Sequence, residues 1–388
     1  MEDLPNEMIV YIIKYLDIPA ALNMSRVNKF YRDLVRRVLL ITVYELFPIT
    51  KNTRYYLNCR KYEIREDIYL DPKPNTMCNL ANWKEVFANK MVCCSNGVTN
   101  MAPFELCLAI NMSGCKDVKP LNVFKRAKIV NITNTDITNF EAGPVLNLFR
   151  ADNNEARINF KGFPKRMNVI SAVNNAIEEI TDIEAVKTLV LDSNLITNLG
   201  SIKKVEYLSV TCTYITAISG LPNLQVLRAN YTDLVTLNLE TPKTLKSLEI
   251  SGTNLPNLNM LVDMSNLECL AVDKFIRSIK VVEHLTNLKY LSIMDSGLVE
   301  EEVDVSNLKN LLSLGFSRNV VGFEKLTQLA ALKIDGRLLY FQDILDKLKL
   351  LTNLKNVAFM GVDRPEMFTE TIDIWSYLPK GCNAVYNV

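Results

Sequence analysis

The sequence has very little histidine, which limits the enzyme chemistry that it can support. His284 is the single histidine among 388 residues. Any histidine-dependent triad would have to use it, and no HExxH or clustered ligand set surrounds it. A phosphate-binding loop of the GxxxxGK type is missing as well. We therefore expect no catalytic residue, no metal site, no cofactor and no enzyme activity.

Several other features are also scarce or missing. Basic residues number 44 and acidic residues 43, so the basic surplus typical of nucleic-acid-binding proteins is absent. No apolar run approaches the roughly 18 residues of a membrane-spanning helix. The acidic start MEDLPNEM does not resemble the beginning of a signal peptide. We expect a soluble protein without a nucleic-acid or membrane partner.

The nine cysteines include no CxxC pair. In a chain of this length without a signal peptide, this pattern indicates free thiols in a reducing compartment. We therefore expect a cytoplasmic protein, with a nuclear location also open. If a virus or pathogen encodes it, the expected location is the host cytoplasm.

The chain does contain a repeat of about 19 to 22 residues. The clearest copies are VKTLVLDSNLI from Val186, VEYLSVTCTYI from Val205, LQVLRANYTDL from Leu224, LKSLEISGTNL from Leu245, LKYLSIMDSGL from Leu288 and LLSLGFSRNVV from Leu311. Weaker copies begin at Ala127, Leu146, Met167, Leu267, Leu329 and Leu354. Apolar residues occupy positions one, four, six and eleven of the clear copies, and Asn, Thr or Ser occupies position nine.

This spacing predicts one short strand in each repeat. Positions four and six are two apart and lie on one face of a strand, whereas positions three, five and seven lie on the other. The polar residue at position nine can bond main-chain groups where the strand ends. The remaining residues are too few for a full helix, so we expect extended or 3₁₀ segments on the outer side. One repeat cannot bury its apolar face alone, so neighbouring repeats must stack.

The repeats resemble short leucine-rich repeats, and the resemblance covers residues 105 to 365. The recurring Asn-Leu phrases that support it are Asn223-Leu224, Asn266-Leu267, Asn287-Leu288, Asn310-Leu311 and Asn353-Leu354. The sequence departs from the usual pattern where Thr or Ser replaces Asn at position nine, as at Thr213, Thr232, Thr253 and Ser296. The resemblance implies a curved solenoid of about 12 units, with a parallel sheet on the concave face and irregular or 3₁₀ segments on the convex face.

The first 40 residues predict three short helices. In LPNEMIVYIIKYLD, the apolar residues from Met8 to Leu16 recur at helical spacing, and Pro5 suits a first helical turn. So small a segment usually needs outside help to bury its core. The apolar pattern alone leaves two interpretations open: these helices cap the repeat solenoid, or they dock on another protein.

The order of residues in this segment resembles the F-box motif over residues 4 to about 40. The matching residues are Leu4-Pro5-x-Glu7, Ile12, Tyr15-Leu16, Leu22, Val27-x-Lys29 with Phe30-Tyr31, and Leu34. The sequence departs from the motif at Asn28, where Cys or Ser is frequent, and at Tyr31, where Trp is frequent. F-box segments dock on the Skp adaptor of Skp–cullin–F-box ubiquitin ligases. The resemblance implies adaptor contacts through Leu4, Pro5, Ile9, Ile12, Leu16, Val27, Tyr31 and Leu34.

Together the two modules predict a substrate receptor, which binds the adaptor and, through it, a cullin, and holds a protein target on the concave face. The best target-binding candidates on that face are Tyr207, Arg228, Glu249 and Tyr290, because Tyr and Arg dominate binding hot spots. The alternative is a leucine-rich-repeat scaffold whose N-terminal helices only cap the solenoid. We assign residues 1–45 to the F-box, 46–104 to a connector and N-terminal cap, 105–365 to the repeats and 366–388 to a C-terminal cap. In that last range, Trp375 and Tyr377 are expected to pack rather than bind.

Overall fold

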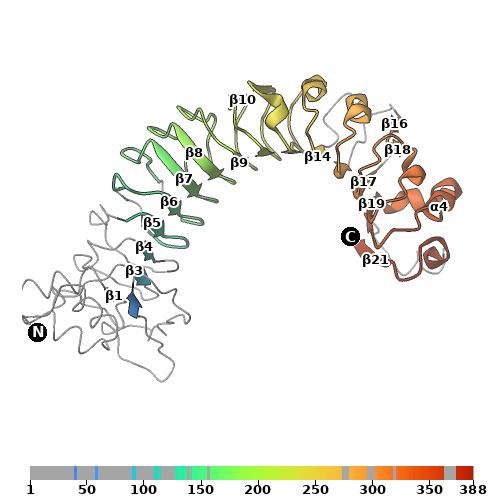
Figure 1. Cartoon of the computed structure of the whole chain (residues 1–388), viewed down its shortest axis with the longest axis horizontal. Helices are drawn as coiled ribbons and strands as arrows, with labels where there is room; N and C mark the ends of the chain where they lie inside the picture. Colours follow the sequence, from blue (N-terminus) through green and yellow to red (C-terminus); the bar gives the residue numbers. More distant parts are fainter. Residues whose placement is uncertain are drawn as a thin grey trace, which may run out of the picture. The chain divides into compact units, whose positions relative to one another are not determined.

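Figure 1 shows the computed structural model of the chain. The structure describes residues 39–41, 57–59, 90–92, 109–112, 114, 127–137, 140, 142–154, 158–272, 279–294, 302–317, 320–361 and 373–387. The chain divides into two compact units, Met1–Val186 and Lys187–Val388.

The first unit contains a ladder of parallel strands. In order they are β3 (Lys90–Val92), β4 (Ala109–Asn111), β5 (Ile129–Asn131), β6 (Leu148–Arg150) and β7 (Arg166–Ser171). A separate antiparallel pair joins β1 (Leu39–Ile41) to β2 (Leu57–Cys59). Since β3 lies in the range assigned to the connector and N-terminal cap, that range contributes a strand to the ladder.

The second unit is built on a longer ladder of the same kind. In order its strands are β8 (Ala185–Val190), β9 (Tyr207–Ser209), β11 (Val226–Arg228), β13 (Ser247–Glu249), β14 (Cys269–Val272), β15 (Tyr290–Ile293), β17 (Ser313–Phe316), β19 (Ala331–Asp335), β20 (Asn356–Met360) and β21 (Asn383–Asn387). All the neighbours pair in parallel, including β20 with β21. The C-terminal range expected to act as a cap therefore supplies the last strand.

Equal positions of neighbouring repeats face each other across this ladder. Leu208, Leu227 and Leu248 hold position four in three successive repeats and are Cα partners. They are fully buried, as are Ala229 and Ile250 at position six. A slip of one residue would move this whole apolar set to the other face, so the buried side chains fix the register. The predicted strand and its buried face are confirmed.

In five of the described repeats, the polar residue at position nine closes the turn after the strand. Asn194 donates from Nδ2 to the carbonyl of Leu191 at 2.8 Å, and Thr232 donates from Oγ1 to the carbonyl of Ala229 at 2.9 Å. The same bond is made by Thr135, Thr213 and Thr253. Threonine therefore replaces asparagine here without loss of the main-chain bond, as expected for a polar residue at this position.

The recurring Asn-Leu phrases also have a structural cause. Asn266 donates from Nδ2 to the carbonyl of Lys243 at 2.9 Å, and Asn287 donates to the carbonyl of Ser265 at 2.8 Å. Asn310 and Asn353 make the corresponding bonds to Thr286 and Thr327. Each bond spans more than 20 residues and links one repeat to the one before it, so the asparagine holds neighbouring repeats together.

The outer segments of the second unit are short, as expected. In Figure 1 its ladder strands follow the inner side of a curve, and the short helices lie on the outer side. The 3₁₀ helices are η4 (Pro242–Thr244), η5 (Asn259–Asp263), η6 (Lys280–His284), η7 (Phe323–Lys325), η8 (Gly336–Tyr340) and η9 (Ile374–Tyr377). Two outer parallel pairs join β10 (Ala217–Gly220) to β12 (Thr236–Leu239) and β16 (Val303–Asp304) to β18 (Val320–Val321).

One outer segment among the described residues is a full α-helix, α4 (Gln342–Leu348). It falls in the repeat that begins at Leu329, the longest of the series, which leaves enough chain for two turns. Leu345 and Leu348 are buried on its inner side, and Lys347 pairs with Asp343 at 2.6 Å. The uniform expectation of extended or 3₁₀ segments is wrong at this one place, because the extra residues allow a helix.

Candidate functional site

The candidate surface is the inner face of the second unit, formed by positions three, five and seven of each repeat. β9, β11 and β13 are consecutive strands, so they bring Tyr207, Arg228 and Glu249 together. Tyr290 lies on β15, which is separated from β13 by β14. Arg228 and Tyr290 are exposed, whereas Tyr207 and Glu249 are half-buried. The four predicted target-binding residues thus share a face but not a single cluster.

Arg228 and Glu249 form an ion pair across two strands. Arg228 Nε donates to Glu249 Oε1 at 3.0 Å, and Asn230 Nδ2 donates to the other carboxylate oxygen at 3.3 Å. Burial alone would lower the pKa of the Arg228 guanidinium, but nearby negative groups, with Glu249 foremost, outweigh it and the pKa is raised. Glu249 therefore holds and neutralises Arg228. This ion pair is a structural reason for a glutamate on the inner face.

Tyr290 has small side chains on both sides in the ladder. Its Cα partners are Cys269 on β14 and Ser313 on β17, so half of its surface, 50%, stays exposed. Burial raises the pKa of the Cys269 thiol, so this neighbour is an uncharged thiol at neutral pH. Tyr290 therefore presents an apolar ring with a polar tip to solvent, and side chains of this kind are enriched at interfaces.

A carboxylate at position seven links neighbouring repeats, a role that we did not predict. Asp192 Oδ1 accepts from Ser209 Oγ at 2.7 Å and from the Thr211 main-chain N–H at 2.8 Å. In the first unit, Asp152 makes the same two bonds to Ser171 and Val173. An Asp at position seven followed by a Ser at position five of the next repeat is the sequence signal that would have found this link.

Replacing Asp192 with alanine should lower the free energy of unfolding by about 1–3 kcal/mol, because the half-buried acceptor of two hydrogen bonds is lost. Urea unfolding followed by circular dichroism measures this change. The exposed Asp233 is the matched control, and Asp233→Ala should shift the free energy by less than about 0.5 kcal/mol. Equal unfolding curves for both variants would contradict a structural role for the Asp192 carboxylate.

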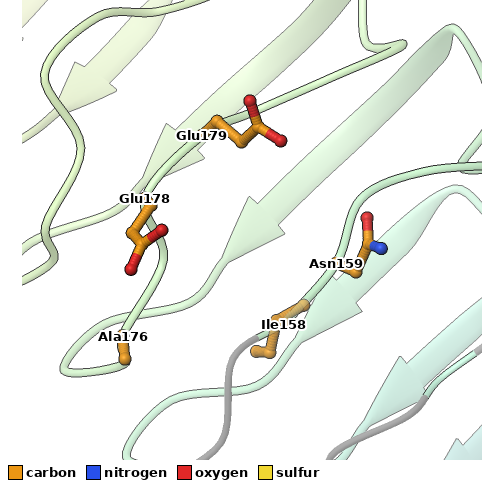
Figure 2. Close-up of a pocket in the computed structure, with 5 residues that line it drawn as sticks. All are labelled: Ile158, Asn159, Ala176, Glu178 and Glu179. Carbon is orange, nitrogen blue, oxygen red and sulfur yellow. The ribbon is translucent and has the colours of Figure 1, made fainter.

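No arrangement typical of catalysis was found among the described residues. The hollow in Figure 2 has a volume of about 240 Å³ and is lined by Ile158, Asn159, Ala176, Glu178 and Glu179. The two glutamate side chains point away from each other, so their carboxylates do not converge. The part of the chain that the structure describes holds no group of three His, Cys, Asp or Glu side chains suited to a metal ion. His284 is exposed at the end of η6.

Two further findings bear on the predicted partners. The predicted adaptor-binding residues lie outside the described residues: Leu4, Pro5, Ile9, Ile12, Leu16, Val27, Tyr31 and Leu34. In the described ranges, no helix combines the length and apolar character needed to cross a membrane.

Comparison with known proteins gives one family match and several similar folds. The model of the F-box domain matches residues 1–42. The functional domain of InlJ from Listeria monocytogenes is similar in structure, with a TM-score of 0.52 and 16% identity over 74% of this chain and 71% of that one. A leucine-rich-repeat protein from Leptospira interrogans matches at a TM-score of 0.43 and 15% identity, over 81% of this chain and all of that one (100%). Among curated proteins, none matches the chain.

The parallel ladder, its buried positions and the likeness to InlJ define a leucine-rich-repeat solenoid. The likeness at this identity extends to the fold alone. The F-box match at residues 1–42 precedes this solenoid in the same sequence, so both predicted modules occur in one chain.

Proposed function

We propose that the protein is the substrate-recognition subunit of a Skp–cullin–F-box ubiquitin ligase. The observation that carries this proposal is the F-box match at residues 1–42 in the same chain as a repeat solenoid. The F-box binds the Skp adaptor and, through it, a cullin. The repeats bind the target protein, and the chain itself contributes no catalytic group.

The adaptor side of the proposal rests on the apolar residues of the first 40. Leu4 and Pro5 enter the adaptor groove, and the apolar residues from Ile9 to Leu34 extend the contact. Burying four or five large apolar side chains at about 1.5–3 kcal/mol each is enough for stable association after the entropic cost of binding.

The target side rests on the inner face of the second unit. Arg228 and Tyr290 offer exposed side chains of the types that dominate hot spots, and Tyr207 and Glu249 flank Arg228. The receptor acts by proximity, because it raises the concentration of the target near a ubiquitin-charged enzyme. This work takes place in the cytoplasm or nucleus, where ubiquitin ligases of this type operate.

Capture experiments with two variants test the proposal. In cells that express the chain, Arg228→Ala/Tyr290→Ser should reduce the recovered target by about tenfold or more and leave the adaptor bound. Leu4→Ala/Pro5→Ala should keep the target but lose both the adaptor and the ubiquitin-modified lysines of that target, measured by mass spectrometry.

The control is Leu350→Ser, which replaces an exposed apolar residue outside the strand face (56% exposed) and should change neither partner. Target modification that persists without adaptor binding would overturn the ligase proposal. The protein would then be a repeat scaffold whose first helices serve as a cap.

A further inference from the structure

The turns that follow the strands of the second unit carry a second set of exposed apolar residues. Leu195 and Tyr214 hold position ten of successive repeats, and Tyr231 holds position eight of the next. Their exposed fractions are 43%, 54% and 66%. The main chain links these turns directly, since Tyr214 N–H donates to the carbonyl of Ile196 at 3.1 Å and Cys212 N–H donates to the carbonyl of Asn230 at 2.9 Å. The three side chains therefore lie along one edge of the sheet, where the strands end.

Tyr231 is an unusual residue for its position. Position eight takes a positive φ in the seven repeats that begin at Ala127, Leu146, Met167, Val186, Val205, Leu224 and Leu245, and Asn and Gly adopt this conformation easily whereas a bulky residue does not. The residues there are Asn134, Asn153, Asn174, Ser193, Cys212, Tyr231 and Gly252, with φ between 53° and 70°. A φ of 54° strains the backbone of a tyrosine. Backbone strain of this kind at a residue with an exposed side chain motivates the hypothesis of a role in function.

The next repeat leaves room for the Tyr231 ring. A Cβ atom at Gly252 would lie only 2.5 Å from Tyr231 Cδ1, so any larger residue at that position would collide with the ring. The ring is thus placed over the backbone of the next turn, and its outer face is presented to solvent.

The charge of this edge is of one sign. The turns 192–198, 211–217, 230–236 and 251–257 contain Asp192 and Asp233 but no Lys or Arg. Lysines of these repeats lie at the opposite, starting end of the strands, as Lys187 and Lys246 do at position two. Arg228, on the nearby face, is already neutralised by Glu249. A partner of positive charge is therefore favoured at the turns.

We propose that this turn edge, defined by Leu195, Tyr214, Tyr231 and Asp233, binds an extended target segment that carries arginine or lysine next to an apolar residue. A guanidinium can lie over a tyrosine face and pair with the Asp233 carboxylate. Three turns that lie about 4.8 Å apart span about the same length as four residues of an extended chain, in which each residue advances about 3.3 Å. The inference rests on the proposed function and specifies the class of target that the repeats recognise.

The test uses a phage-displayed library of random dodecapeptides, selected on the full-length chain. The selected peptides should contain Arg or Lys beside an apolar residue. In fluorescence anisotropy with these peptides, Tyr231→Asn should weaken binding at least about tenfold, and Asp233→Lys should weaken it as well. The control Tyr340→Asn, which removes a tyrosine that is 69% exposed at the end of η8, should bind like the wild type.

A stability measurement on the same variants separates a binding role from a structural one. Since asparagine adopts the positive φ more easily than tyrosine, Tyr231→Asn should melt at the same temperature as the wild type or higher. Peptides without basic residues, peptides that ignore the Tyr231 change, no selected peptides at all, or a lower melting temperature would each overturn the inference. Affinity for the Skp adaptor is measured on the same samples, and a well-folded wild-type chain that does not bind the adaptor would overturn the ligase proposal instead.

Discussion

Replacing Phe149 with alanine should lower the free energy of unfolding of the first unit by about 3–5 kcal/mol. Phe149 holds position four of its repeat and is fully buried. Its ring centroid lies 5.0 Å from that of Phe163, 5.1 Å from that of Phe140 and 6.5 Å from that of Phe160. The substitution removes the ring on which the other three pack, and the rigid main-chain ladder around it cannot collapse to fill the space.

Urea unfolding and hydrogen exchange measure this effect. Because each repeat contacts its neighbours, exchange should speed up most in β5, β6 and β7, and least in β19 and β20. The control is Phe341→Ala, which removes a phenylalanine that is 60% exposed and should cost less than about 0.5 kcal/mol. Similar losses for both variants would contradict the buried Phe cluster as a main source of stability.

The strands and their buried face could be predicted from the sequence because the same apolar spacing recurs in many repeats. Leu227 and Ala229 are two apart, and the same spacing recurs in every clear copy. One face must then be buried, and neighbouring copies must align in register. The 3₁₀ segments could be predicted from the small number of residues left between strands. The helix α4 was not predicted, because its repeat is longer than the rest.

The contacts between repeats were harder to predict, because they join residues about 20 apart through side chains that look solvent-exposed in a single copy. Within its own repeat the Asp192 carboxylate has no evident partner in the sequence, yet it accepts two hydrogen bonds from the next repeat. Glu249 seemed a free contact residue, yet it pairs with Arg228. A period-two pattern gives the face of a side chain but not its partner on the neighbouring strand.

For the candidate surfaces, too, the sequence predicted the face on which a side chain lies but not its surroundings. Arg228 and Tyr290 were placed on the correct face by their positions, and the structure adds that both are exposed. Tyr231 was not selected, because position eight is a turn position whose positive φ is visible only in the structure. Trp375 was expected to pack, but it is 55% exposed, since a 3₁₀ helix as short as η9 buries only part of its residues.

The Leu4→Ala/Pro5→Ala variant should bind the Skp adaptor at least about 100-fold more weakly than the wild type. Two apolar side chains would leave the adaptor groove, and a loss of about 3 kcal/mol corresponds to this factor. The repeat domain should keep its circular dichroism spectrum and melting temperature, because the proposed contact is made with the adaptor and not with the solenoid. A fall in melting temperature would instead indicate that these residues cap the repeats.

Isothermal titration of the purified full-length chain with the Skp adaptor tests the central claim most directly. Our account predicts a saturable one-to-one complex with the wild type and loss of that complex in Leu4→Ala/Pro5→Ala at unchanged folding. A well-folded wild-type chain that gives no binding heat and no co-migration with the adaptor would contradict the account, and the F-box segment would not serve a ubiquitin ligase.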